Sequence, residues 1–390
     1  MQQKKRYVVR RVLITLHRYI GLTLGLVLVV TGLTGSVSVF WRELHEVLDP
    51  KLRIEVAGER YRPYAEITAA VNEAFPGRQN AWALYLPWDT KGVLYAVYDE
   101  PEERAGAYES PLYVAVNPYT AKVMSHYYWG ETAVSWVYNL HSHLNAGTFG
   151  MLLVGMLGIV LLALALSGLY LWWPVGRFTR RQWVIERHAG AARFEFDLHR
   201  VGGVYLLILL LVMSITGIMI AFPQQTARVI NAFAPVNAPL QLEDAPAPTS
   251  TVQPGVTPIT ADEAVARAMK LFPQATLRSL HVPGGLRVAF DVNLRQPSET
   301  FDRFYPNTHV WIDQYSGKVL AVLDASQFNV SRKLFSLRTP FHGGEALGTA
   351  GRVLVCITGF VPLLMFITGL RRWLKARKSA ARAATAPQTS

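Results

Sequence analysis

Four apolar stretches, each long enough to cross a lipid bilayer, limit what this chain can form. They lie near residues 13–40, 144–173, 201–222 and 349–370, and a crossing helix needs about 20 apolar residues. Backbone polar groups inside a bilayer must be hydrogen-bonded within the chain, which favours helices. The first stretch has a basic start like a signal peptide, but its apolar run is too long and no A-x-A site follows it. We therefore expect an α-helical integral membrane protein with four transmembrane helices, the first an uncleaved anchor.

The net charge of +12 is concentrated beside these stretches. Residues 1–12 contain five basic and no acidic residues, residues 174–198 five basic and three acidic, and the tail from Arg371 six basic and no acidic. Basic residues collect on the cytoplasmic side of membranes. We therefore predict a bacterial inner-membrane protein with both termini in the cytoplasm, two large periplasmic loops and no nucleic-acid partner.

This orientation divides the chain into segments. The expected cytoplasmic segments are the N-terminus (1–12), a loop (174–198) and the tail (374–390). With their polar ends included, the spans are 13–40, 141–173, 199–222 and 342–373. The periplasmic domains are 41–140 and 260–341, and six prolines between residues 235 and 258 predict an extended linker at 223–259. The only cysteine, Cys356, excludes an intramolecular disulfide.

Each periplasmic segment has the pattern of a helix followed by short strands. In the first, residues 64–75 predict a helix, and 82–86, 93–98, 112–116 and 122–127 predict strands. In the second, the helix is expected at 262–272 and the strands at 276–281, 286–292, 308–312 and 318–322. The helices end alike, at Phe75-Pro76 and Phe272-Pro273. We therefore expect two separate α+β units that repeat one another.

The apolar stretches repeat as well. Leu-His-Arg occurs at 16–18 and 198–200, and from each histidine the same offsets reach a glycine, Thr-Gly and Phe. The matched residues are Gly21 and Gly203, Thr34-Gly35 and Thr216-Gly217, and Phe40 and Phe222. The chain therefore contains two copies of one unit, and each copy consists of a span, an outer domain and a second span. Because both copies begin in the cytoplasm, we expect a two-fold parallel repeat with its axis along the membrane normal.

The repeat selects among the ten histidines. From His342, glycines follow at 348, 351, 359 and 369 with Trp373 after them, and the same offsets from His141 give glycines at 147, 150, 158 and 168 with Trp172. Counting from His143 destroys this match. The repeat therefore predicts two facing pairs, His17 with His199 at the cytoplasmic ends and His141 with His342 at the periplasmic ends.

Two opposed imidazoles with no repeated carboxylate or thiolate beside them suit haem, ligated from both faces. Zinc or copper would need further donors that the repeat does not supply. We expect Gly21 and Gly203 to let a porphyrin lie against the backbone and Gly35 and Gly217 to make room for a second one, and we assign the repeated glycines of the second and fourth spans to helix packing.

The paired histidines and the basic residues near them also have interpretations that involve no cofactor. A single histidine at a membrane boundary is more often interfacial than a ligand, and a duplicated gene carries irrelevant residues in both copies. The histidines without a repeat partner are expected to be surface or structural: 45, 126, 143, 188, 281 and 309. Basic residues could meet haem propionates or an anionic substrate, namely Arg18 and Arg200 inside and Arg332, Lys333 and Arg338 outside.

The sequence resembles the PepSY-associated transmembrane family, and within it the FoxB-like ferric-siderophore reductases. The resemblance rests on LHRYIGLTLG (16–25), NLHSHLNAGTFG (139–150), DLHRVGGVY (197–205) and FHGGEALGTAGR (341–352). It implies PepSY-like outer domains and two b-type haems on His17, His141, His199 and His342. The chain departs from the family's phrase at Asn139, where Asp is implied.

The resemblance implies an oxidoreductase that passes electrons from the cytoplasmic side to ferric siderophore in the periplasm and releases Fe(II) for iron uptake. The sequence does not identify the electron donor, which is a quinol, a flavin or a partner protein on the cytoplasmic side. We expect the substrate near Trp129, Trp136 and Tyr138. Two alternatives remain open: a non-enzymatic membrane-anchored protein whose outer domains bind or restrain a periplasmic partner, and a di-haem reductase of another acceptor.

Overall fold

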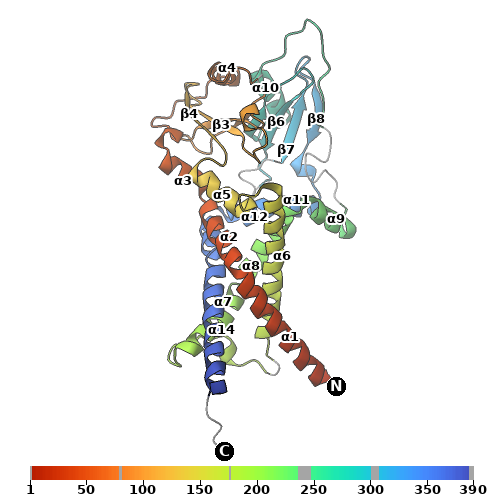
Figure 1. Cartoon of the computed structure of the whole chain (residues 1–390). Coiled ribbons are helices and arrows are strands. Elements are labelled where there is room, and N and C mark those ends of the chain that lie inside the picture. Colours follow the sequence, from red (N-terminus) through yellow and green to blue (C-terminus); the bar gives the residue numbers. More distant parts are fainter. Residues whose placement is uncertain (1, 79–80, 175–176, 236–246, 300–306, 386–390) are drawn as a thin grey trace, which may run out of the picture.

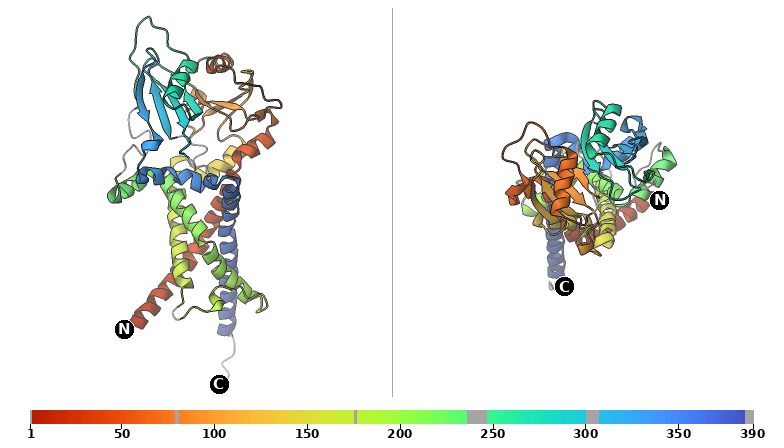
Figure 2. Two further views of the ribbon diagram at one scale, coloured as in Figure 1. Left: turned by 180° about the vertical axis from the view of Figure 1, so that it is seen from behind. Right: turned by 90° about the horizontal axis from the view of Figure 1, so that it is seen from above.

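A computed structural model describes residues 2–78, 81–174, 177–235, 247–299 and 307–385. A bundle of long helices carries a β-sheet with covering helices at one end, which we call the sheet end (Figure 1). Helix α1 begins and helix α14 ends at the opposite end of the bundle (Figures 1 and 2). Both ends of the described chain therefore lie on one side.

Seven of the described helices form the bundle. They are α1 (Gln2–Thr23), α2 (Gly25–Ser38), α6 (Gly147–Trp172), α7 (Ala191–Tyr205), α8 (Leu207–Ala221), α13 (Gly348–Thr358) and α14 (Val361–Thr385). The segments Gly147–Trp172 and Glu345–Ala381 are each long and apolar enough to cross a membrane. The pairs α1–α2 and α7–α8 pass the same test only as bent pairs, so the described residues contain two such helices, or up to four spans.

The first and third expected spans are bent, by 57° and 60°. The bends fall at Leu24 and Leu206, each seven residues after the histidine of a Leu-His-Arg phrase, and φ is −94° at both. Glycines weaken a helix and accompany sharp kinks. They lie on both sides of the first bend, at Gly21 and Gly25, and shortly before the second, at Gly202 and Gly203.

Glycines also set how closely the bundle helices pack. At Gly158 of α6, an added Cβ would lie 3.1 Å from Ile218 of α8. At Gly359, between α13 and α14, it would lie 2.0 Å from Ser36 of α2. Helix α6 also contacts α1, and α14 contacts α7. Each span therefore has two neighbours, and the first and third lie diagonally opposite, as do the second and fourth.

The outer segments form one sheet of eight strands. The strands are β1 (Ala83–Tyr85), β2 (Leu94–Tyr98), β3 (Leu112–Val116), β4 (Val123–Tyr128), β5 (Thr276–His281), β6 (Phe290–Arg295), β7 (Thr308–Ile312) and β8 (Val319–Leu323). Their order is β4-β3-β2-β1-β5-β6-β7-β8, and every neighbouring pair is antiparallel. The expectation of two separate units was therefore wrong. Strands β1 and β5 pair, with Leu84 opposite Leu280, because an unpaired strand edge leaves its hydrogen-bonding groups unsatisfied.

The two halves of the sheet share one pattern. Each is a helix followed by four strands, with α4 (Tyr64–Ala74) in the first half and α10 (Ala261–Leu271) in the second. Register shifts fall between Ala115 and Val116 in β3 and between Trp311 and Ile312 in β7. These are equivalent positions in the two hairpins. The helices cover the same face, and the core between them and the sheet is continuous across both halves.

Strand β6 begins later than the expected 286–292. Leu286 lies in a turn and Val288 forms only an isolated bridge with Thr249, and both are exposed, whereas Val292 and Leu294 are buried. Gly284 and Gly285 allow the chain to turn before the strand. The strand therefore extends to Arg295.

Short helices join the bundle to the sheet, and the sequence did not predict them. They are α3 (Trp41–Leu48), α5 (Ala133–His143), α9 (Pro223–Phe233), α11 (Val330–Ser336) and α12 (Arg338–His342). Single 3₁₀ turns are η1 (Pro50–Leu52), η2 (Glu102–Arg104), η3 (Arg180–Gln182), η5 (Ala325–Gln327) and η6 (Glu345–Leu347). The expected linker at 223–259 thus begins with a helix, because Pro223 suits the first helical position; its residues 236–246 lie outside the described part of the chain.

The expected boundaries of the second and fourth spans also change. His141 lies on α5 and His342 on α12, and neither lies on the long helix that follows. Leu144 and Asn145 have φ of +50°, which ends α5 before α6 begins at Gly147. Past the expected end at residue 373, α14 continues to Thr385.

Candidate paired-histidine site

The two histidines of the Leu-His-Arg phrases face each other inside the bundle. His17 lies on α1 and His199 on α7, the diagonally opposite pair. Their ring centres are 6.3 Å apart, with the ring planes at 85°. Both side chains are half-buried. Residues 182 positions apart in the sequence therefore form one pair near the end opposite the sheet.

The second pair forms at the sheet end. His141 at the end of α5 and His342 at the end of α12 have ring centres 6.1 Å apart, with the planes at 34°. His143, the alternative that the sequence offered, lies elsewhere. It contacts Tyr108 and lies 3.6 Å from a carboxylate oxygen of Glu109. The geometry therefore brings together the histidines that the repeat pairs.

Each of the four rings is held through its Nδ1 atom. Nδ1 of His17 lies 2.9 Å from Ser167 Oγ, and Nδ1 of His199 lies 2.8 Å from Thr368 Oγ1. At the sheet end, Nδ1 of His141 donates to the carbonyl of Thr31 at 2.8 Å, and Nδ1 of His342 lies 3.0 Å from Thr216 Oγ1.

The hydroxyl groups have their own acceptors. Ser167 donates to the carbonyl of Leu164, Thr368 to that of Leu364, and Thr216 to that of Val212. Their oxygens are therefore left to accept a hydrogen bond from the imidazole. This assigns the proton of each ring to Nδ1 and leaves the lone pair of Nε2 for another partner, as in histidines that ligate metals.

Sequence reasoning missed these hydrogen-bond partners, although the signal was present. Ser167 and Thr368 each follow the sheet-end histidine of their own span by 26 residues. The repeat therefore matches them as it matches the histidines. Thr216 belongs to a matched Thr-Gly pair, but its counterpart Thr34 donates to the carbonyl of Val30 instead.

Matched glycines lie against the histidine rings. An added Cβ would lie 2.7 Å from the ring of His141 at Gly35 and 3.2 Å from that of His342 at Gly217. At the other end, Gly168 and Gly369 lie beside His17 and His199, at 3.5 and 3.7 Å. Assigning all glycines of the second and fourth spans to packing was therefore wrong for these two. At Gly21, an added Cβ would meet no atom within 4 Å.

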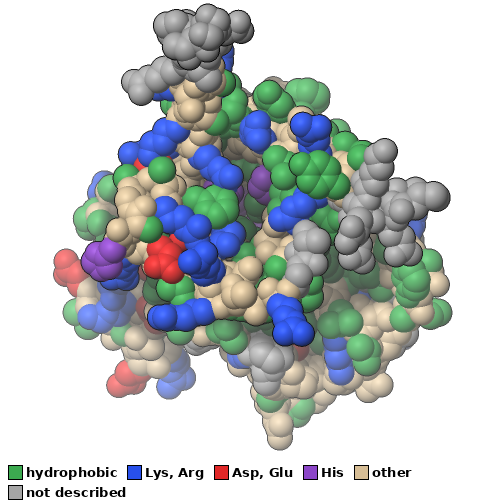
Figure 3. Space-filling view, turned by 90° about the horizontal axis from the view of Figure 1, so that it is seen from below, with side chains coloured by type: hydrophobic (Ala, Val, Ile, Leu, Met, Phe, Trp, Pro, Cys, Tyr) green, Lys and Arg blue, Asp and Glu red, His purple; other side chains and the backbone are tan. Residues whose placement is uncertain are grey.

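The end of the bundle opposite the sheet is hollowed and basic. Figure 3 shows a histidine side chain inside a hollow bordered by Lys, Arg and hydrophobic side chains. Arg200 is already engaged there, because its Nη2 donates to the fully buried carboxylate of Asp197 at 2.9 Å and also bonds the carbonyl of Arg181. Arg18 is exposed. Of the two, Arg18 is the one left open to an anion.

An aromatic cluster lies between the sheet-end histidines and the sheet. It consists of Trp41, His45, Tyr95, Tyr113, Tyr127, Trp129 and Tyr138. Tyr138 lies one turn before His141 on α5, and its ring centre is 5.3 Å from that of Trp129. Asn139 accepts a hydrogen bond from Trp129 Nε1 at 2.9 Å, so this departure from the family phrase positions Trp129. Trp136 is half exposed, at 50%.

The basic residues before His342 have mixed roles. The guanidinium groups of Arg332 and Arg338 lie over the ring of Phe335, which is fully buried. Lys333 is exposed. The first two therefore contribute to the packing around Phe335 where α11 meets α12.

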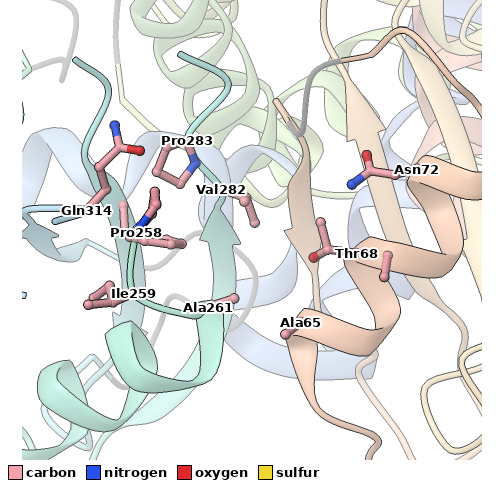
Figure 4. A pocket seen from close by; sticks show the side chains of 11 residues that line it. Ala65, Thr68, Asn72, Pro258, Ile259, Ala261, Val282, Pro283 and Gln314 are labelled. Carbon is pink, nitrogen blue, oxygen red and sulfur yellow. The ribbon is translucent and has the colours of Figure 1, made fainter. Parts of the chain in front are cut away.

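A separate cavity of about 330 Å³ lies between α4 and α10, on the sheet face that these helices cover (Figure 4). Ala65, Thr68 and Asn72 line it from α4, and Pro258, Ile259 and Ala261 line it from the second half. Within the described ranges, no three His, Cys, Asp or Glu side chains are grouped to hold a bare metal ion.

The sequence model of the family described as the PepSY-associated transmembrane region matches residues 14–376 of the chain. The chain is a member of the PepSY-associated transmembrane family. The match covers both histidine pairs of this membrane protein together with the whole sheet. No curated protein matches the sequence at a significant level.

Proposed function

We propose that this PepSY-associated transmembrane protein is a di-haem b reductase that passes electrons across the bacterial inner membrane to ferric siderophore in the periplasm. The observation that carries the proposal is the pairing of four repeat-matched histidines, His17 with His199 and His141 with His342, at ring distances of 6.3 and 6.1 Å. Each ring is fixed through Nδ1.

The ring distances fit one metal ion between two imidazoles. With metal–nitrogen bonds of about 2.0–2.1 Å, ligands on opposite sides have ring centres roughly 6 Å apart. Two nitrogen donors without a carboxylate or thiolate suit haem iron better than a bare metal ion. Gly21, one turn after His17, has open space beside it that leaves room for a planar group. The glycines beside the four rings let the imidazoles lie close against the neighbouring helices.

His17 with His199 and His141 with His342 would each hold one haem, and the bound haem would supply one-electron transfer. The protein's own contribution is to hold the rings. Ser167, Thr31, Thr368 and Thr216 fix their orientation and keep Nε2 unprotonated, and donation from Nδ1 makes the ligand more basic. One pair lies toward each end of the bundle, which supports transfer over most of the membrane thickness.

The direction of transfer is part of the proposal. The basic end of the bundle faces the cytoplasm by the positive-inside rule, so the donor is a quinol or a cytoplasmic-side partner near His17 and His199. The acceptor binds near the aromatic cluster above His141 and His342. Reduction to Fe(II) weakens chelation by hard oxygen donors, so iron leaves an intact chelator.

Anaerobic reoxidation tests this function. Purified full-length protein reduced with dithionite is mixed with a panel of ferric siderophores, free ferric chelates and oxidised flavin while its Soret band and Fe(II) release are recorded. We expect reoxidation by ferric siderophore with about one Fe(II) per electron. Reoxidation only by flavin or by a free ferric chelate would show that the acceptor is not a siderophore. Haem that no member of the panel oxidises would refute the proposal that the protein is a reductase.

A second candidate has one observation in its favour. The cavity between α4 and α10 offers a binding place far from the histidines, suited to a non-enzymatic protein that binds or restrains a periplasmic partner. A folded, colourless protein that retains a partner from the periplasm would favour this candidate over the reductase.

A further inference from the structure

Helix α9 is amphipathic and packs only part of its apolar side. Thr226, Val229, Ile230 and Phe233 follow the spacing of one helix face, while Gln224, Arg228 and Asn231 follow that of the opposite face. None of its residues is buried, and Val229 and Phe233 are 59% and 87% exposed. An apolar edge of this helix therefore remains uncovered.

Helix α11 extends this uncovered surface. The side chain of Asn329, which caps α11, donates to the carbonyl of Pro235 just after α9. One face of α11 holds the buried Phe335, and the other exposes Val330 and Leu334 at 73% and 58%. The two helices contain three basic residues and no acidic one.

The position of α9 decides what covers this surface. The helix begins at Pro223, directly after α8 ends at Ala221, and projects sideways from the sheet end of the bundle near the level of α12 (Figures 1 and 2). Helix α8, which precedes it, also exposes apolar side chains, such as Ile208, Ile215 and Ile220. The apolar edge of α9 therefore follows directly in the chain on a helix that exposes apolar side chains, at the end of the bundle nearest the sheet.

The equivalent helix in the first half differs. Helix α3 begins at Trp41, 24 residues after His17, as α9 begins 24 residues after His199. Trp41 and His45 pack into the aromatic cluster. Glu43 and Glu46 pair with Arg352 and Arg53, so α3 is held by protein on its inner side.

We propose that α9 and the exposed face of α11 lie in the lipid–water interface at the sheet end. The apolar edge enters the region between headgroups and acyl chains, and Arg228 and Lys333 meet headgroup phosphates, as in other interfacial helices. Because α12 and His342 follow α11 directly, the bilayer surface supports this half of the sheet-end histidine pair. This inference does not depend on the proposed function.

Spin-label accessibility tests the proposal. Single cysteines are introduced into the full-length Cys356→Ala protein at Val229, Phe233, Arg228 and Val47, and labelled in nanodiscs of phosphatidylcholine and phosphatidylglycerol. We expect the labels at Val229 and Phe233 to be relaxed weakly by a water-soluble nickel complex and strongly by oxygen, which dissolves in the bilayer. Val47 of α3, 74% exposed, is the matched control and stays accessible to nickel, as does Arg228 on the polar face.

Two outcomes would overturn the proposal. Nickel accessibility at Val229 and Phe233 equal to that at Val47 would place α9 in water. Protection of both labels from nickel and oxygen alike would show that protein covers the edge. Substitutions at these exposed positions leave the core unchanged, and an unaltered size-exclusion profile checks that each variant is folded.

Discussion

Hydrogen bonds from Nδ1 decide what the four histidines can do. A ring that donates from Nδ1 presents an unprotonated Nε2, and the acceptor makes that nitrogen a stronger ligand. Three of the acceptors are hydroxyl oxygens and one is the carbonyl of Thr31. The hydroxyls are the part of this arrangement that a single substitution can remove.

If His17 and His199 hold a haem as proposed, loss of the Thr368 hydroxyl should raise its potential. Thr368→Val removes the acceptor of His199, so the ligand becomes less basic and stabilises Fe(III) less. In a spectroscopic redox titration we expect one midpoint to move upward and the other to stay. Thr368→Ser keeps the hydroxyl and should titrate like the wild type; identical midpoints in Thr368→Val would show that this bond does not tune a haem.

His45 should make the stability of the sheet end depend on pH. It is 3% exposed, its Nε2 lies 2.8 Å from Thr132 Oγ1, and burial lowers its pKa to about 4 although Asp49 opposes this. The unfolded chain binds a proton below its ordinary pKa of 6.5 and the folded protein does not. Stability is therefore complete above about pH 6.5 and falls by about 3 kcal/mol toward about pH 4.

Thermal unfolding followed by near-ultraviolet circular dichroism over this pH range measures the loss. His45→Gln keeps a polar side chain without a titrating group, and its profile should be flatter by that amount. Equal slopes for the two proteins would assign the pH dependence to other groups.

At the scale of elements, a sharp turn between α5 and α6 positions His141 beside His342. Helix α5 is capped by Thr132 and Ser135 and ends at Leu144 in a left-handed conformation. Helix α6 then starts so close that an added Cβ at Gly150 would lie 1.6 Å from the carbonyl oxygen of His143. The equivalent Gly351 lies as tightly against Gly344, at 2.1 Å.

Gly150→Ala should break this turn. The methyl group cannot fit without moving α5, so we expect a loss of about 1–3 kcal/mol and release of the sheet-end haem with the other retained. Haem content and thermal unfolding measure both effects. Phe149→Ala changes an exposed neighbour in the same turn and should retain both haems. Full haem content in Gly150→Ala would show that the turn does not position His141.

The sequence predicted most strands and the outer helices to within a few residues, because apolar alternation and turn residues are local signals. It did not predict that α5 and α6 are separate. Leu144 reads as part of an apolar run, and its φ of +50° depends on packing at Gly150 and not on its own side chain. Helices α11 and α12, with seven and five residues, lack sufficient length for a clear periodicity.

At the scale of the whole molecule, one sheet ties the two halves together. Strands β1 and β5 pair at its centre, and the carboxylate of Asp262 accepts from the backbone of Tyr64 and Ala65 at 2.9 Å, so the second half caps α4 of the first. The repeat matches β1 with β5, but matching equivalent positions does not show that the two strands pair. The repeat identified which histidines match, since it compares equivalent positions, and it could not show what holds each ring.

Haem stoichiometry measured on histidine variants tests the central claim most directly. A pyridine haemochrome assay with electron paramagnetic resonance should find two low-spin b haems per chain in the wild type and in His143→Ala. It should find one in each of His17→Ala, His141→Ala, His199→Ala and His342→Ala. A folded protein without haem, or loss of a haem from His143→Ala but not from His141→Ala, would contradict the account.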